Sequence, residues 1–223
     1  MKAVILAAGK GTRMKPLTDH VPKPMVVIRG KSFLEHLVEA FPPEVDEIIV
    51  VVGYRGEMIQ ELLARKYPKK KIRIVFQKKL SGTGSALMLV KKFMDRKGRF
   101  LLAYGDEYIT RVQMKKCMLN KYSWLVRRMD DPSQSGVVSI SKTGRIFNVT
   151  EKPKKFMGDM VSAGVMIVDY GIFDGRPVRH KTGEYYLTSM MQKFIKTHVV
   201  KAVPGTDNLA FSTAQDVANF NKK

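Results

Sequence analysis

The feature that most constrains the fold is a series of continuously apolar runs of strand length in the first half of the chain. They occupy residues 2–8 (KAVILAA), 44–54 (EVDEIIVVVGY) and 99–108 (RFLLAYGDEY), and residues 71–77 (KIRIVFQ) alternate as a fourth strand. Strands that are apolar without alternation are buried on both faces, which is typical of parallel sheets covered by helices.

Segments with helical periodicity separate these strands. Apolar residues recur at helical spacing in residues 33–41, 55–67 and 83–94, and Ser32 stands where it can cap the first helix. The alternation predicts an α/β fold: a doubly wound, mostly parallel, Rossmann-like mixed sheet flanked by helices.

The pattern changes after about residue 110. Short strand-like segments with glycine turns follow at 121–129, 135–153 and 159–169, and we expect them to form one short-stranded wall of a cleft. The remaining elements are a helix at 186–197, a strand at 198–204 and a helix at 212–221 capped by Ser212 or Thr213. No linker or repeat interrupts the chain, so we predict a single domain over residues 1–223.

The composition favours anionic ligands. With 40 basic and 20 acidic residues the net charge is +20, which attracts nucleic acid, anionic membranes or small phosphorylated substrates. The densest basic run, residues 66–73 (KYPKKKIR), matches no known nucleic-acid motif and is typical of a solvated loop. We therefore favour phosphorylated small molecules; a nucleic-acid binder, whose affinity would fall steeply with salt, is the alternative.

The cysteine count and hydropathy indicate a cytoplasmic protein. Cys117 is the single cysteine, so no intrachain disulfide can form and a reducing compartment fits best. No apolar run approaches the ~20 residues that span a bilayer, and we expect no membrane partner. The four histidines have no zinc-ligand spacing.

The loop after the first strand is a candidate phosphate site. Gly9 and Gly11 would let the backbone approach phosphate oxygens, and Arg13 could add a bidentate contact at the carboxyl end of the strand. Met14 stands where a dinucleotide fingerprint needs its third glycine, and the P-loop pattern is absent. Taken alone, the loop is either a phosphate cradle or a structural turn.

The wider stretch, residues 6–24 (LAAGKGTRMKPLTDHVPKP), closely resembles the signature of the sugar nucleotidyltransferases. Further segments resemble the motifs of that family in the same order, across essentially the whole chain. They are QKKLSGTGSAL (77–87), GDE (105–107), SGVVSISKTGRIFNVTEKP (135–153), VSAGVMIVD (161–169) and GEYYLT (183–188).

The resemblance implies a Mg²⁺-dependent reaction in which a sugar 1-phosphate attacks the α-phosphate of a nucleoside triphosphate and pyrophosphate leaves. It implies a nucleotide-binding half over about residues 1–110 and an acceptor-binding half over about 111–223. The nucleotide-binding residues would be Leu6, Ala7, Ala8, Gly9, Gly11, Thr12, Arg13, Lys23, Gln77, Gly82 and Thr83. The acceptor-binding residues would be Gly136, Glu151, Lys152, Ser162 and Glu184.

Three residues would carry the chemistry. By the resemblance, Arg13 holds the β- and γ-phosphates, Lys23 neutralises charge at the α-phosphate, and Asp106 binds Mg²⁺. Gln77 and the Gly82 backbone would read the base, with UTP or dTTP favoured.

The sequence departs from the family pattern at two positions. Ala210 stands where many members have a second metal-binding aspartate, so Asp207 is the upstream candidate, and Ser162 replaces the usual asparagine. These departures keep two alternatives open: a cytidylyltransferase acting on phosphocholine or an inositol phosphate, and a non-catalytic nucleotide-binding module. The sequence does not indicate an oligomeric state.

Overall fold

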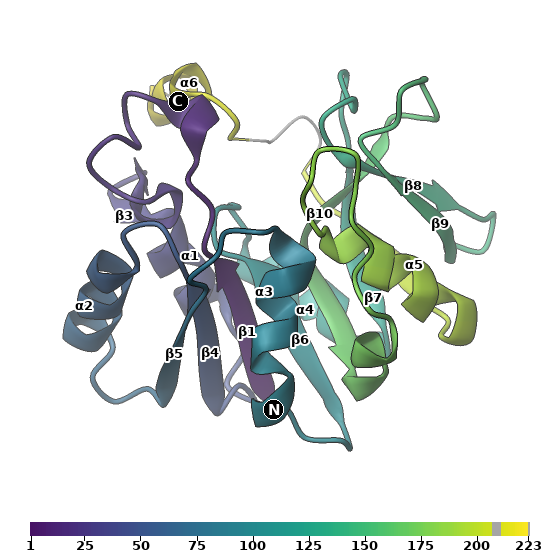
Figure 1. Cartoon of the computed structure of the whole chain (residues 1–223), viewed down its shortest axis with the longest axis horizontal. Coiled ribbons are helices and arrows are strands. Elements are labelled where there is room, and N and C mark those ends of the chain that lie inside the picture. The colour runs from purple at the N-terminus through teal and green to yellow at the C-terminus, as the bar shows by residue number, and fades with distance from the viewer. Residues whose placement is uncertain (207–210, 223) are drawn as a thin grey trace.

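A mixed sheet forms the centre of the molecule (Figure 1). The computed structural model describes residues 1–206 and 211–222, and within them the sheet has nine strands. Seven of them follow the order β11-β7-β10-β6-β1-β4-β5, while β8 (Gly136–Ile140) and β9 (Ile146–Glu151) extend it from β10. The seven are β1 (Lys2–Ala7), β4 (Glu47–Val52), β5 (Ile72–Phe76), β6 (Arg99–Tyr104), β7 (Ser123–Arg128), β10 (Met160–Asp169) and β11 (Lys201–Pro204).

The pairing confirms the predicted fold class. β1 pairs in parallel with both β4 and β6, and β4 pairs in parallel with β5. β10 runs antiparallel to its neighbours β6 and β7. The chain leaves β1 toward β4 and β5 and then returns to β6 on the other side, so the topological switch point lies between β1 and β6. Ligands bind at the carboxyl ends of the strands at such a point.

Helices cover both faces because the central strands are apolar on both sides. Ala3 and Ile5 of β1 lie in one buried cluster with α1 (Phe33–Ala40), α2 (Gly56–Lys66) and α4 (Arg111–Met118). Val4 and Leu6 point the other way, into a cluster with α3 (Thr83–Val90) and α5 (Leu187–Thr197). The continuous apolar run 2–8 thus fills two cores at once.

The helix starts follow local capping chemistry. The Ser32 hydroxyl accepts a hydrogen bond from the backbone N–H of Glu35 and caps α1, as predicted. Thr213, the second of the two predicted caps, begins α6 (Ala214–Asn221) through the same capping box. In the part of the chain that the structure describes, no helix combines the length and the apolar character needed to cross a membrane.

Several predicted boundaries were wrong. α4 was not predicted: its sequence RVQMKKCM buries only Met114 and Cys117, which is too short an apolar stripe to recognise, although Thr110 and Gln113 form a capping box. The predicted helix 83–94 ends at Val90 and continues as a 3₁₀ turn.

The second-half strands also differ from the expected short wall. β7 and β10 belong to the main sheet, and β10 is ten residues long. Only β8 and β9 lie outside the main strand order, and β6 ends at Tyr104 rather than reaching residue 108.

A backbone contact joins the first and second halves of the chain. Tyr185 donates its backbone N–H to the Ser81 carbonyl at 2.8 Å, and its own carbonyl accepts from the Gly84 N–H at 2.7 Å. Gly82 lies between them with φ +104, and a Cβ there would stand 2.5 Å from the Tyr185 carbonyl oxygen. Only glycine fits this position, since both the backbone angle and the space exclude a side chain.

We expect Gly82→Ala to destabilise the protein by about 3 kcal/mol, because it combines left-handed backbone strain with a backbone clash. The matched control is Gly144→Ala: Gly144 has φ +75 but open space around its Cβ position, so it carries only the strain, about 1 kcal/mol. Urea unfolding of both variants measures the difference. An equal decrease in the free energy of unfolding of the two variants would show that the backbone at Tyr185 moves away from the new Cβ without an energetic cost.

Candidate active site

A cavity of about 590 Å³ opens at the carboxyl ends of β1 and β6, where the topology places a ligand. It gathers most of the predicted site residues from segments distant in sequence. The predicted residues that line it are Leu6, Ala7, Ala8, Gly9, Gly11, Thr12, Arg13, Lys23, Gln77, Gly82, Thr83, Asp106, Lys152 and Glu184.

The loop after β1 presents free backbone donors to this cavity. Within the described residues, no protein group accepts a hydrogen bond from the backbone N–H groups of residues 9–13. Gly11 takes the left-handed conformation (φ 63), and its carbonyl accepts hydrogen bonds from the Met14 N–H and the Thr18 hydroxyl. A Cβ on Gly11 would lie 2.8 Å from Lys23 Cβ. Glycine therefore lets the loop close over Lys23 while its N–H groups stay available to an anion.

Lys23 and Asp106 form an ion pair inside the cavity. Lys23 begins the 3₁₀ turn η2 (Lys23–Met25), and Asp106 lies two residues after the end of β6. The Lys23 ammonium donates to Asp106 Oδ2 at 2.8 Å, with side-chain exposures of 16 and 38 %. Neither charge is fully immersed in water, so the ammonium of Lys23 stabilises the ionised form of Asp106.

The pKa of Asp106 is lowered. Burial opposes ionisation most strongly, but the charge and hydrogen bond of Lys23 together with the more distant charge of Arg13 outweigh it. Asp106 is therefore an anion at neutral pH. Arg13 and Lys10 line the cavity and make no hydrogen bond or ion pair with any described residue. Their charges are therefore available to a ligand.

Gln77 and Gly82 form one wall. Gln77 is 6 % exposed and donates its Nε2 to the Gly82 carbonyl at 3.2 Å, which fixes its amide beside the backbone of residues 81–84. The Thr83 hydroxyl accepts a hydrogen bond from the Leu187 N–H at 2.9 Å and ties this wall to α5. Polar groups are thereby held rigidly at a surface that also includes Leu80 and Ala86.

Lys152 belongs to a side-chain network on the opposite wall. Its ammonium donates to the Tyr186 hydroxyl at 2.7 Å and lies 4.6 Å from the centre of the Tyr186 ring. The Tyr186 hydroxyl donates in turn to the Glu184 carboxylate. Lys152 has φ 42, an uncommon angle for a residue with a side chain, which its backbone hydrogen bond to the Ser135 carbonyl helps to hold.

The remaining predicted acceptor residues form a cluster behind this network and do not line the cavity itself. Glu151 accepts a hydrogen bond from the Thr188 hydroxyl at 2.8 Å. A Cβ on Gly136 would stand 2.9 Å from Ser162 Oγ and 3.5 Å from Glu151 Oε2, so the three residues are close neighbours. Burial raises the pKa of Glu151, with Glu184 adding to the rise and Thr188 and Lys152 opposing it.

Two tyrosines in the cavity were not predicted. Tyr186 sits between Lys152 and Glu184, and Tyr104 lines the cavity beside Thr83. Burial and the negative charges of Glu151, Glu107 and Asp106 raise the pKa of Tyr104, so it stays protonated. Both follow or overlap predicted motifs (AYGDE and GEYYLT), but only the fold shows that their hydroxyls point inward.

Asp106 is the carboxylate that a cation could use next to the glycine loop of residues 9–13. Asp106 is ionised and lines the cavity, and within the described residues no group of three or more histidine, cysteine or acidic side chains could enclose a metal. Asp207 and Ala210 lie outside the described residues. A divalent cation here would depend on Asp106 and on ligand oxygens, which is how Mg²⁺ commonly binds with phosphates.

The sequence matches a known protein family and several curated proteins. A sequence model described as "Nucleotidyl transferase" matches residues 2–210. The bifunctional protein GlmU of Methanocaldococcus jannaschii is 33% identical over 205 residues, which are 91% of this chain and 49% of that protein. The GlmU of a Methanococcus maripaludis strain is 35% identical over 200 residues, 88% of this chain and 47% of that protein.

A third relative, mannose-1-phosphate guanylyltransferase 1 of Arabidopsis thaliana, is 31% identical over 185 residues, 78% of this chain and 51% of that protein. The chain thus spans about half the length of the curated relatives it matches.

The Asp106 carboxyl offers a direct test of the site electrostatics. In Lys23→Met the pKa of Asp106 should rise above its ordinary value of 3.8, because the main favourable charge is lost while burial remains. Arg13→Met should raise it less, since Arg13 contributes least among the causes. Carboxyl ¹³C NMR titration measures both; an unchanged pKa in Lys23→Met would contradict the assignment.

Proposed function

Because the chain belongs to the nucleotidyl transferase family, we propose that it transfers a nucleoside monophosphate group from a nucleoside triphosphate to a sugar 1-phosphate. The products are a nucleoside-diphosphate sugar and pyrophosphate. The observation that carries the proposal is the Lys23–Asp106 ion pair beside the free N–H groups of residues 9–13. These are the charges that a triphosphate and its cation require, in one cavity at the switch point.

The glycine loop, residues 9–13, would bind the triphosphate. Its backbone N–H groups would bind phosphate oxygens without needing a net charge, and the uncommitted guanidinium of Arg13 would hold the β- and γ-phosphates. Lys10, in the same loop, adds a second cation close to them. This end of the cavity would stabilise the departing pyrophosphate.

Asp106 would hold Mg²⁺ together with phosphate oxygens, since its lowered pKa makes it a carboxylate ligand at neutral pH. Mg²⁺ supplies charge neutralisation at phosphate oxygens when it is bound. Lys23 would then be free to turn from Asp106 to the α-phosphate, because a cation at the carboxylate replaces the ammonium as its partner.

The chemical step needs no protein nucleophile. A phosphate oxygen of the sugar 1-phosphate forms a bond to the α-phosphorus while the bond from that phosphorus to the bridging oxygen of the β-phosphate breaks. The electron pair of the broken bond leaves with pyrophosphate. Arg13 and Lys23 stabilise the charge that develops on the phosphate oxygens, and the walls keep the two reactants in line.

The fixed amide of Gln77 and the Gly82 backbone would hydrogen-bond the edge of the base, and we favour UTP or dTTP. Lys152 would bind the phosphate of the acceptor, with Glu151, Ser162, Gly136 and Glu184 around the sugar. The buried thiol of Cys117, whose pKa burial raises to about 12, is unreactive and takes no part. We propose a cytoplasmic location, which suits a chain with a single buried thiol.

Turnover should depend on the ion pair. With Mg²⁺, five nucleoside triphosphates and a panel of sugar 1-phosphates, pyrophosphate release should appear with one preferred pair. Lys23→Ala and Asp106→Asn should each reduce kcat by about 10²-fold or more, since each removes charge stabilisation at the phosphates. Lys142→Ala, at an exposed lysine in the turn between β8 and β9, is the control and should match the parent protein.

Other results of that assay would redirect the proposal. Release with phosphocholine or an inositol phosphate and CTP would replace the sugar acceptor, which the small Ser162 side chain would accommodate. Nucleotide binding without release from any acceptor would mean a non-catalytic binding module. Binding of nucleic acid that ignores Arg13 and Lys23 would refute the nucleotide site altogether.

Tyr186 should act on acceptor binding alone. Tyr186→Phe removes the hydroxyl that holds Lys152 and Glu184 but keeps the ring under the ammonium, so KM for the sugar 1-phosphate should rise about tenfold. KM for the nucleotide should not change. Tyr185→Phe is the matched control, because the Tyr185 hydroxyl makes no hydrogen bond within the described residues. Equal effects of the two substitutions would disprove the role of the hydroxyl.

A further inference from the structure

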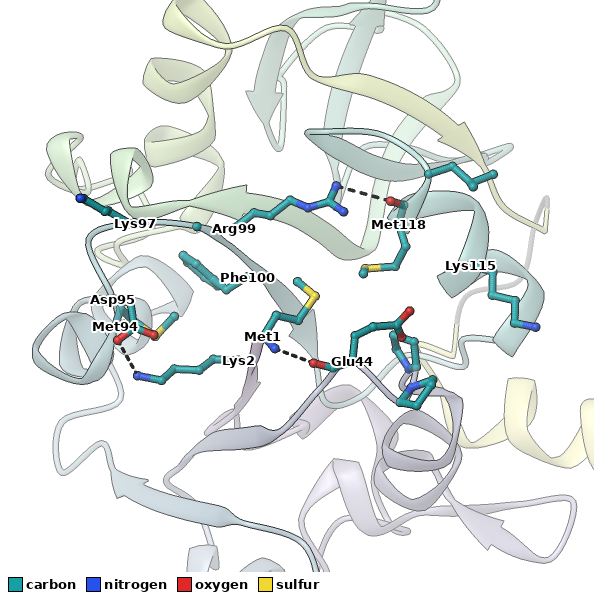
Figure 2. Close-up of a pocket in the computed structure, with 14 residues that line it drawn as sticks. Met1, Lys2, Glu44, Met94, Asp95, Lys97, Arg99, Phe100, Lys115 and Met118 are labelled. Atoms are coloured by element: carbon teal, nitrogen blue, oxygen red, sulfur yellow. Dashed lines mark hydrogen bonds and ion pairs between the residues drawn. The ribbon is translucent and has the colours of Figure 1, made fainter.

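A second cavity, of about 860 Å³, lies at the amino-terminal edge of the sheet (Figure 2). The starts of β1 and β6 form its floor, and residues 42–44, residues 94–98 and the end of α4 form its sides. The nucleotide cavity lies at the opposite ends of the same two strands. A six-residue strand rises ~20 Å, so the two cavities are separate sites.

The centre of this cavity is apolar and rich in methionine. Met1, Phe100 and Met118 converge there in Figure 2, and Met94 joins the lining. Phe100 and Met94 are 3 and 8 % exposed and are fixed by the core, whereas Leu119 at the rim is 85 % exposed. Methionine sulfur makes favourable contacts with aromatic rings and adapts to their shape.

The rim is positively charged. It carries Lys2, Lys97, Arg99 and Lys115 against Glu44 and Asp95, and a salt bridge of 3.2 Å between Lys2 and Asp95 uses one cation and one anion. Arg99 donates to the backbone carbonyls of Met118 and Asn120, which leaves its charge uncompensated.

The ammonium groups of Lys97 and Lys115 make no hydrogen bond or ion pair within residues 1–206 and 211–222, and the two residues stand at opposite ends of the cavity (Figure 2). Among the described residues that line the cavity, three cationic side chains thus remain without an ion pair beside one such carboxylate, Glu44, while the amino terminus of Met1 is paired with Asp46.

We propose that this cavity is a second ligand site, for a small aromatic anion. The apolar floor would take the ring, Arg99 beside it would take the negative group, and Lys97 and Lys115 would add positive potential from the two ends of the cavity. The volume lies within the ~300–1,000 Å³ typical of small-molecule sites, whose linings are mostly apolar with a few polar groups. An inorganic anion would leave the apolar floor unused, and a neutral apolar ligand would leave the cationic rim unused. The proposal does not depend on the function of the nucleotide cavity.

The probe is 8-anilinonaphthalene-1-sulfonate, an aromatic anion, and its neutral counterpart is N-phenyl-1-naphthylamine. Fluorescence titration of the whole protein should show saturable binding of the sulfonate, about tenfold tighter than the neutral compound. Excess nucleoside triphosphate with Mg²⁺ should not displace it. The Lys23→Ala variant should bind it equally, which separates this test from the catalytic proposal.

Methyl NMR with ¹³C-labelled methionine locates the probe. The sulfonate should shift the resonances of Met94 and Met118, which line this cavity, and leave Met14, which lines the nucleotide cavity, unchanged. Nucleotide should do the reverse. Shifts confined to Met14, or displacement of the sulfonate by nucleotide, would overturn the proposal.

Charge reversal tests the rim without disturbing the core. Lys97→Glu with Lys115→Glu should weaken sulfonate binding about tenfold. The matched control, Lys142→Glu with Lys196→Glu, makes the same change in net charge at exposed positions that line neither cavity, and should alter binding less than about twofold. Equal weakening by both pairs, or equal affinity for the neutral compound, would show that the cavity does not select an anion.

Discussion

The parallel pairing of β1 with β6 is the constraint on which the nucleotide cavity depends. Leu6 lies beside Tyr104 in the register, and the Gly105 N–H donates to the Leu6 carbonyl at 2.9 Å, so the pairing continues past the end of β6. The glycine loop and Asp106 therefore leave neighbouring strands at the same edge. A Cβ on Gly105 would stand 3.0 Å from that of Ala7, which shows how closely the two strand ends approach.

The ion pair of Lys23 and Asp106 adds an electrostatic consequence to this geometry. A lone carboxylate in a half-buried cavity tends to take up a proton. The ammonium of Lys23 keeps Asp106 charged, and neither side chain is fully buried. A polyanion arriving with its cation can thus replace both partners at once, because it offers an anion to Lys23 and a cation to Asp106.

The sequence predicted the elements that depend on continuous patterns. Apolar runs located the central strands, the glycine-rich loop located Gly11, and the family resemblance located Gly82; the backbone angles of both glycines are ones that no other residue adopts easily. α4 was missed because two buried residues make no readable stripe. Tyr186 was missed for another reason: its hydroxyl contacts Lys152, which follows β9, and Glu184 in the segment before α5, and no spacing along the chain encodes these contacts. A single sequence thus predicts positions that require a particular backbone conformation more readily than it predicts hydrogen bonds between distant side chains.

The net charge of +20 does not act as one uniform electrostatic field. The cations beside each of the two cavities act separately. At physiological ionic strength the Debye length is ~8 Å, so a cation acts only on ligands close to it. The cavities stand ~20 Å apart along β1, and Lys97, Arg99 and Lys115 consequently contribute little to the phosphate binding that we propose for Arg13 and Lys23. Charges at the amino-terminal edge must act on whatever binds there, and the apolar floor beneath them favours a ligand with a ring over a hydrated ion. The two ends of one pair of strands therefore attract anions of different chemistry.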